Sequence, residues 1–150
     1  PDTVVEFGSA FGVSGMYFLA GLEMSGGGQL LTFEPNRVWA DIARNNLKQI
    51  SDRFKLTVGT FEENICKVMD SGQSIDLALI DAIHTSKFVL PQLEMVVKKS
   101  RPGTIILLDD INFSEDMATC WKAIATDGRF CASAELGGRV GLLELRGMLL

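Results

Sequence analysis

Short apolar segments alternate with helical patterns along most of this chain, and the alternation restricts the folds open to it. We expect strands at residues 3–7, 29–34, 55–58, 75–81 and 104–109. Helices are expected after them at residues 13–24, 37–49, 62–69, 87–99 and 114–125. Successive strands joined by helices lie parallel, because a parallel pair needs a long crossover connection. The pattern therefore predicts an α/β domain built on a parallel sheet.

The last part of the chain has a different pattern. Two strand-like segments, residues 129–136 and 139–146, are separated only by Gly137-Gly138. Two glycines between such segments indicate a tight two-residue turn, so we expect an antiparallel hairpin. With the five strand–helix units, the hairpin predicts a Rossmann-like, doubly wound sheet of seven strands with helices on both faces. Such sheets bind ligands at the carboxyl ends of their strands.

Composition narrows the classes of function. The 150 residues suffice for one domain, and because the chain starts at Pro1, almost on a strand, we expect a further N-terminal segment in the full-length protein. A net charge of −5 without basic clusters argues against nucleic-acid partners. We expect neither a signal peptide nor a membrane-spanning helix, because these 150 residues contain no apolar run of the roughly 20 residues that cross a bilayer. Cys66, Cys120 and Cys131 form no Cys-x-x-Cys pair, which favours reduced, buried thiols and a cytoplasmic location.

The turn after the first expected strand carries the clearest motif. Residues 4–14 read Val-Val-Glu-Phe-Gly-Ser-Ala-Phe-Gly-Val-Ser, with Gly8 and Gly12 four apart and a helical pattern directly after them. Glycines allow a ligand to approach the backbone closely, and a helix start offers unpaired N–H groups. Glu6 at the strand end favours a partner with hydroxyls or positive charge over a naked phosphate. The motif predicts a site for a nucleotide-like ligand.

Acidic residues end several of the expected strands. They are Glu6, Glu34, Asp81, Asp109 and Asp110. Each alone also has an ordinary explanation, since acids cap helices and face water at loop starts. Together they would meet at one edge of the sheet, where their repulsion needs a cationic or hydroxyl-bearing partner.

The opening motif resembles that of the class I S-adenosylmethionine-dependent methyltransferases. The resemblance rests on Glu6-Phe7-Gly8-Ser9-Ala10-Phe11-Gly12, on Glu34 and on the terminal hairpin, and it implies the strand order 3-2-1-4-5-7-6. It also implies that Gly8 and Gly12 face the methionine part of the cofactor and that Glu34 holds the ribose hydroxyls. Ser14 would bind the amino-acid end, and Thr60 and Phe61 would border the adenine. The full cofactor set is Glu6, Gly8, Ser9, Gly12, Ser14, Glu34, Thr60, Phe61 and Asp81.

Two other functions remain open for such a fold. A nicotinamide-dependent oxidoreductase also places an acid on the ribose, but Gly8-x-x-x-Gly12 lacks the G-x-G-x-x-G spacing that a pyrophosphate needs. A non-catalytic cofactor-binding or interaction domain could keep the same fold. Binding of S-adenosylhomocysteine, with and without Mg²⁺, separates these alternatives.

A finer resemblance concerns the metal-dependent O-methyltransferases of the catechol and macrolide-sugar types. Asp81-Ala82-Ile83-His84 and Leu108-Asp109-Asp110-Ile111-Asn112 match their metal segments, and the separation of 109 − 81 = 28 residues matches their spacing. The resemblance implies Mg²⁺ held by Asp81, Asp109 and Asp110, and hard oxygen ligands suit this ion. Without a metal, Asp109 would cap the next loop and Asp110 would face solvent.

His84 is the only histidine of the chain, and it lies three residues after Asp81. The resemblance places His84 as the catalytic base and Asp81 beside it, and an imidazole in general titrates near the pH at which a base operates. We expect O-methylation of a hydroxyl on a small molecule, such as a sugar or a catechol-like compound. No nucleic-acid or membrane partner is expected, and a homo-oligomer is compatible with the sequence.

Overall fold

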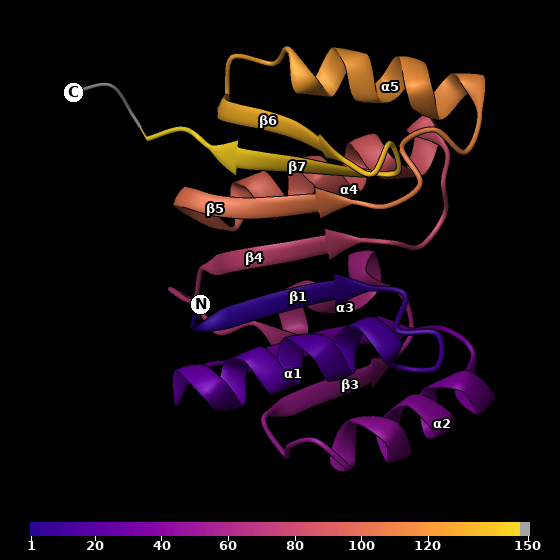
Figure 1. Ribbon diagram of the computed structural model, residues 1–150. Coiled ribbons are helices and arrows are strands. Elements are labelled where there is room, and N and C mark those ends of the chain that lie inside the picture. Colours follow the sequence, from indigo (N-terminus) through magenta and orange to yellow (C-terminus); the bar gives the residue numbers. More distant parts are fainter. Residues whose placement is uncertain (148–150) are drawn as a thin grey trace. The chain divides into compact units, whose positions relative to one another are not determined.

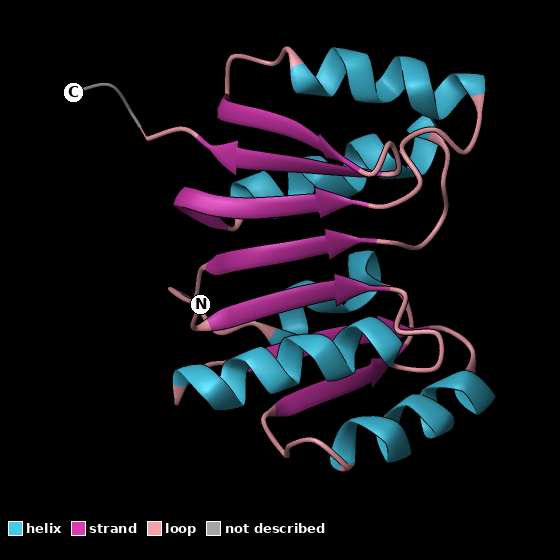
Figure 2. Ribbon diagram, viewed as in Figure 1, coloured by secondary structure: helices cyan, strands magenta, loops and turns pink. Residues whose placement is uncertain are grey.

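The computed structural model describes residues 1–147 and consists of two compact units, Pro1–Gln73 and Ser74–Leu150. Strands and helices alternate up to the final hairpin (Figures 1 and 2). The strand order is β3-β2-β1-β4-β5-β7-β6, which confirms the seven-stranded sheet predicted from the sequence.

The first unit contains three parallel strands in the order β3-β2-β1. They are β1 (Thr3–Phe7), β2 (Gln29–Glu34) and β3 (Phe54–Val58). The helices are α1 (Val13–Ser25), α2 (Arg37–Lys48) and α3 (Phe61–Val68). In the register, Glu6 lies opposite Thr32 and Phe7 opposite Phe33, so the carboxyl ends of β1 and β2 lie side by side.

Aromatic packing and small residues hold this unit together. The Phe61 ring lies 3.7 Å from that of Phe7 and 5.4 Å from that of Phe33, measured between centroids, and all three are buried. A Cβ at Gly15 would come within 2.8 Å of the Leu47 Cδ2 atom, so α1 and α2 pack closely at this glycine. The core under the β1 turn is therefore closely packed.

The second unit contains two parallel strands and the antiparallel hairpin. The strands are β4 (Ile75–Ile80), β5 (Ser100–Leu108), β6 (Phe130–Leu136) and β7 (Val140–Leu145). The helices are α4 (Ser86–Lys98) and α5 (Glu115–Ala125). β4 pairs with β5 in parallel, and β7 pairs antiparallel with both β5 and β6. Ser114 caps α5, accepting a hydrogen bond from the Met117 N–H.

Two sequence expectations need correction. Arg139 was expected to begin the last strand, but the ladder of the hairpin ends at Leu136 and Val140, which leaves Arg139 in the turn. The thiols were expected to be buried, but only Cys120 is, while Cys66 and Cys131 are exposed. Both depend on which face or end of an element a residue occupies, which the local pattern does not fix.

Among the described residues, every helix is too short or too polar to cross a membrane.

Candidate functional site

The turn after β1 is fixed by backbone geometry. Gly8 and Gly12 have φ angles of 83° and 85°, in the left-handed region that favours glycine. The N–H groups of Gly8 and Ser9 both donate to the Phe33 carbonyl oxygen, at 3.0 and 3.1 Å. A Cβ at Gly12 would lie 3.2 Å from the Cα of Ala43, so this glycine also allows α2 to approach. Gly12, the N-cap of α1, makes no side-chain hydrogen bond to the first turn of this helix, and the first N–H groups of a helix have no partner within the helix.

Glu6 lies beneath this turn with no exposed surface. Its carboxylate accepts hydrogen bonds from the Ser14 hydroxyl and, at 2.6 Å, from Thr32 Oγ1. Thr32 Oγ1 in turn lies 2.6 Å from Ser9 Oγ. Burial raises the pKa of the Glu6 carboxyl, although the hydrogen bonds from Ser14 and Thr32 act in the opposite direction. Glu6, Ser9 and Ser14, all predicted to bind cofactor, thus belong with Thr32 to one hydrogen-bonded network that braces the turn.

Glu34 ends β2 beside the same turn. Its Oε2 accepts a hydrogen bond from the Ala10 N–H at 2.9 Å, and its Oε1 accepts one from the Asn36 N–H at 2.8 Å. Only 5% of the residue is exposed. Two backbone donors therefore fix the orientation of the carboxylate, and each oxygen retains a lone pair for a further donor. This arrangement fits the predicted grip on two ribose hydroxyls.

The predicted adenine residues follow β3. Thr60 is the N-cap of α3, and its hydroxyl accepts a hydrogen bond from the Glu63 N–H at 3.4 Å. The Phe61 ring points into the core, where it contacts Phe7 and is 2% exposed. Thr60 is half-buried and accessible at this edge. Phe61 shapes the edge from beneath, because its ring is taken up by core contacts.

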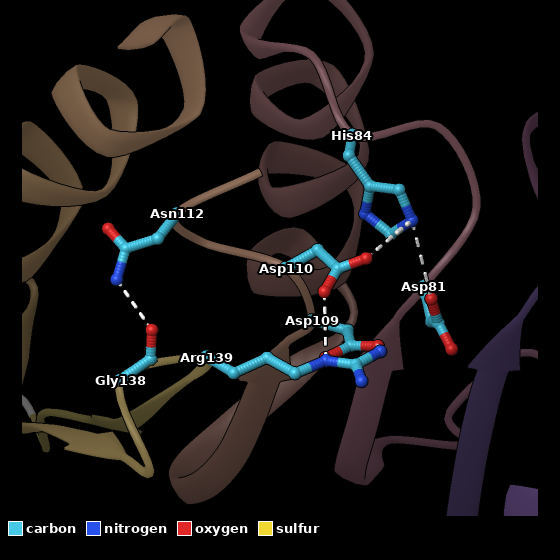
Figure 3. A network of polar contacts seen from close by, with 7 residues as sticks. All are labelled: Asp81, His84, Asp109, Asp110, Asn112, Gly138 and Arg139. Atoms are coloured by element: carbon cyan, nitrogen blue, oxygen red, sulfur yellow. Dashed lines mark hydrogen bonds and ion pairs between the residues drawn. The ribbon is translucent and has the colours of Figure 1, made fainter. Parts of the chain in front are cut away.

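In the second unit, the structure brings together four of the predicted residues (Figure 3). Asp81 follows β4, and Asp109 and Asp110 follow β5. The Nε2 atom of His84 lies 3.7 Å from Asp81 Oδ1 and 3.6 Å from Asp110 Oδ2. These distances are within reach of an ion pair but too long for a hydrogen bond. The side chain of His84 is 20% exposed, and its ring centroid lies 5.5 Å from that of Phe113.

Sequence reasoning missed the cation of this cluster. Arg139 Nε and Nη2 lie 3.0 and 2.8 Å from the two oxygens of Asp109, and Nε lies 2.8 Å from Asp110 Oδ1. Hydrogen bonding to Asp109 and the charges of Asp109, Asp110 and Asp81 raise the pKa of Arg139. The one sequence signal was the position of this arginine, directly after the two turn glycines. That signal does not say which way the side chain points.

A second missed contact joins the loops of this unit. Asp116, in the first turn of α5, accepts hydrogen bonds from the N–H and the hydroxyl of Ser86, both at 2.7 Å. Ser86 begins α4, so the loop that carries Asp81 and His84 is tied to the loop that carries Asp109 and Asp110. These hydrogen bonds lower the pKa of Asp116. The contact helps to hold His84 near the acids.

The three acids of the second unit are also candidates for a metal site. Asp81, Asp109 and Asp110 offer oxygen donors of the right chemistry. Across residues 1–147, however, no three His, Cys, Asp or Glu side chains are grouped as a bound ion requires. The guanidinium of Arg139 lies against both oxygens of Asp109 and one of Asp110. As arranged, this cluster holds an arginine.

Comparison with known proteins identifies the family. A family model described as a methyltransferase domain matches residues 5–111, which include the β1 turn, Glu34, Asp81 and Asp109. The chain belongs to this family. The class I S-adenosylmethionine-dependent methyltransferase predicted from the opening motif is thereby confirmed. No curated protein matches the methyltransferase in sequence.

Solved structures confirm the fold of the methyltransferase. An O-methyltransferase from Bacillus cereus in complex with S-adenosylhomocysteine has a TM-score of 0.75 and 23% identity, over 95% of this chain and 74% of that chain. The O-methyltransferase TomG from Streptomyces achromogenes, in complex with S-adenosylmethionine, has a TM-score of 0.79 and 17% identity, over 97% and 74%. An rRNA methylase from Streptococcus thermophilus has a TM-score of 0.72 and 15% identity, over 97% and 87%. The same fold therefore occurs in methyltransferases whose names indicate different kinds of acceptor.

Proposed function

We propose that this methyltransferase transfers a methyl group from S-adenosylmethionine to a hydroxyl oxygen of a small molecule, with His84 as the base. The observation that carries the proposal is the position of His84. It is a half-buried imidazole within 3.7 Å of two carboxylates, at the ends of strands where such folds bind their ligands. The O-methyltransferases among the structural neighbours are consistent with this choice of acceptor atom.

The first unit supplies the cofactor contacts in this proposal. S-adenosylmethionine, when bound, provides an electrophilic methyl group on a positively charged sulfur. Glu34, held by the N–H groups of Ala10 and Asn36, accepts hydrogen bonds from the ribose hydroxyls. The turn at Gly8 and Gly12 lets the methionine part lie against the backbone. Glu6 stabilises that turn from beneath, without contact with the ligand.

His84 has one task in the proposed reaction. It removes the proton from the acceptor hydroxyl as the oxygen attacks the methyl carbon, so the imidazole gains the proton that the oxygen loses. The new C–O bond forms while the C–S bond breaks, and the electron pair of that bond leaves on sulfur. The carboxylates of Asp81 and Asp110 lie within ion-pair distance of Nε2, beside the ring that receives this proton. General base catalysis of this kind contributes roughly 10²- to 10⁴-fold to a rate.

Magnesium on Asp81, Asp109 and Asp110 is the finer part of the sequence prediction. The donors are chemically suitable, but Arg139 occupies the oxygens of the Asp109–Asp110 pair. As arranged, the acids do not fit a divalent ion, and no step of the proposed reaction is routed through one. Magnesium therefore stays a prediction from the sequence, and the Mn²⁺ titration described below tests it.

The acceptor is proposed to be small and hydroxylated. A net charge of −5 opposes binding to a phosphate backbone, in contrast to what the rRNA methylase among the neighbours must accommodate. A panel of catechols, glycosides and other hydroxylated metabolites, with formation of S-adenosylhomocysteine as the readout, identifies the class. A cytoplasmic location stays a prediction.

The central experiment is His84→Ala. We expect turnover to fall roughly 10²- to 10⁴-fold, while the affinity for S-adenosylhomocysteine, measured by calorimetry, changes by less than a few fold. Glu34→Ala is the matched variant, because it should weaken S-adenosylhomocysteine binding roughly tenfold or more through the lost ribose contacts. Unchanged turnover in His84→Ala removes His84 from the mechanism. Binding of S-adenosylhomocysteine without turnover on any acceptor favours a non-catalytic cofactor-binding domain.

A further inference from the structure

The Arg139 guanidinium is placed by the backbone around it. Gly137 and Gly138 have φ angles of 58° and 66°, and the Arg139 N–H closes their turn by donating to the Leu136 carbonyl oxygen at 3.1 Å. The Ile111 N–H donates to the Arg139 carbonyl oxygen at 2.9 Å. The hairpin turn is therefore anchored to the loop that carries the acids, and hydrogen bonds hold the backbone of Arg139 in place.

A further hydrogen bond anchors the same turn. Asn112 Nδ2 donates to the Gly138 carbonyl oxygen at 2.5 Å, so the segment directly after Asp110 holds the turn directly before Arg139 (Figure 3). Asp110 itself has a φ of 52°, a left-handed conformation that is uncommon outside glycine. This backbone directs its carboxylate toward the guanidinium on one side and toward His84 on the other.

The four carboxylate oxygens of Asp109 and Asp110 each lie close to Arg139 or to His84. Both oxygens of Asp109 bind Arg139, as does Oδ1 of Asp110, while Oδ2 of Asp110 faces His84 at 3.6 Å. A divalent ion would need these same oxygens, and it would place a charge of +2 against a guanidinium that stays protonated at any working pH. The two cations therefore exclude one another.

We propose that Arg139 is the resident cation of the Asp109–Asp110 pair and takes the place of a divalent ion, so that this methyltransferase works without one. The expectation that turnover needs no divalent ion rests on the proposed function. The expectation that the wild type binds Mn²⁺ weakly does not. Arg139 acts as a positioning residue: it holds the two carboxylates in place beside His84. Its side chain is 64% exposed, so solutes, including metal ions, have access to the cluster.

The test is titration of the purified chain with Mn²⁺, followed by electron paramagnetic resonance of the free ion. We expect no binding tighter than the millimolar range in the wild type and at least tenfold tighter binding in Arg139→Met. Adding Asp109→Asn to that variant should remove the gain, because the gained site uses this carboxylate. Arg44→Met is the matched control, since Arg44 pairs with Asp41 on α2, at 2.6 Å, and its loss should leave Mn²⁺ binding unchanged.

The outcomes are distinct. Micromolar Mn²⁺ binding by the wild type overturns the inference, and so does an Arg139→Met variant that binds Mn²⁺ no more tightly than wild type. If Arg139→Met does not fold, Arg139→Gln keeps a polar side chain and answers the same question. Once an acceptor is found, wild-type turnover in excess EDTA should match turnover in Mg²⁺. If the protein neither binds S-adenosylhomocysteine nor methylates any acceptor, the proposed function is wrong. The Mn²⁺ titration still decides the role of Arg139 in that case.

Discussion

The acids of the two units are satisfied in opposite ways. In the first unit, Glu6 and Glu34 are buried and are held by neutral donors, namely hydroxyls and backbone N–H groups. In the second unit, Asp109 and Asp110 keep 14% and 26% of their side chains exposed, and their main partner is a cation, Arg139. Buried acids with neutral partners are part of the framework, whereas accessible acids with a charged partner can exchange it. The acids of the first unit are therefore part of its packed framework, whereas the acids of the second unit remain accessible to a different cationic partner.

The largest expected effect lies in the framework. Glu6→Ala leaves the hydroxyls of Ser14 and Thr32 without their acceptor in a buried site and opens a cavity. We expect the free energy of unfolding to fall by about 2 to 4 kcal/mol, measured by urea denaturation. Asp110→Asn is the comparison, because asparagine tolerates positive φ and the residue is more exposed, so its cost should stay below about 1 kcal/mol. An equal decrease in the free energy of unfolding in the two variants would contradict the proposed difference between the acids of the two units.

A smaller effect concerns pH. Burial raises the pKa of Glu6 in the folded protein, so between the unfolded value of about 4.3 and the folded pKa the native state binds more protons than the unfolded state. The contribution of Glu6 to the free energy of unfolding should therefore decrease as pH rises through this window, and level off above it. Glu6→Gln cannot ionise and should lack this decrease. Denaturation curves from pH 4 upward check it, and parallel curves for both proteins would contradict it.

The smallest effect is expected at the exposed cluster. Arg139→Met leaves Asp109 and Asp110 to repel one another near the surface. We expect a slight decrease in the thermal unfolding midpoint at low ionic strength that disappears in high salt, because exposed charges are screened. Arg44→Met again serves as the control. A large loss of stability at every salt concentration would make Arg139 as structural as Glu6.

Much of the first unit follows from short stretches of sequence. The turn at Gly8 and Gly12 was predictable because its positive φ angles demand particular residues at particular places. Glu34 was predictable because it directly ends an apolar strand. What could not be read was that the side chains of Glu6 and Phe61 are fully buried, since burial of a side chain depends on what packs above it.

In the second unit, the sequence placed Asp81, His84, Asp109 and Asp110 correctly at strand ends, but it left their partner unknown. Arg139 lies 30 residues beyond Asp109 in the chain, and only hairpin pairing with β5 brings the two together. Arg139 lies in the turn, one residue before β7 begins at Val140. The alternation of apolar and polar residues did not predict this position, because it does not show where a turn ends.

The amino-acid sequence by itself determined the order of the elements, the glycine turn and the acids that end the strands, because these depend on local backbone preferences and on periodic burial. The tertiary structure decided which partner each acid has. A carboxylate can be satisfied by hydroxyls, N–H groups or a guanidinium, and which of them lies within reach depends on the folded chain around it. For Glu6 that choice is a pair of hydroxyls, and for Asp109 it is Arg139.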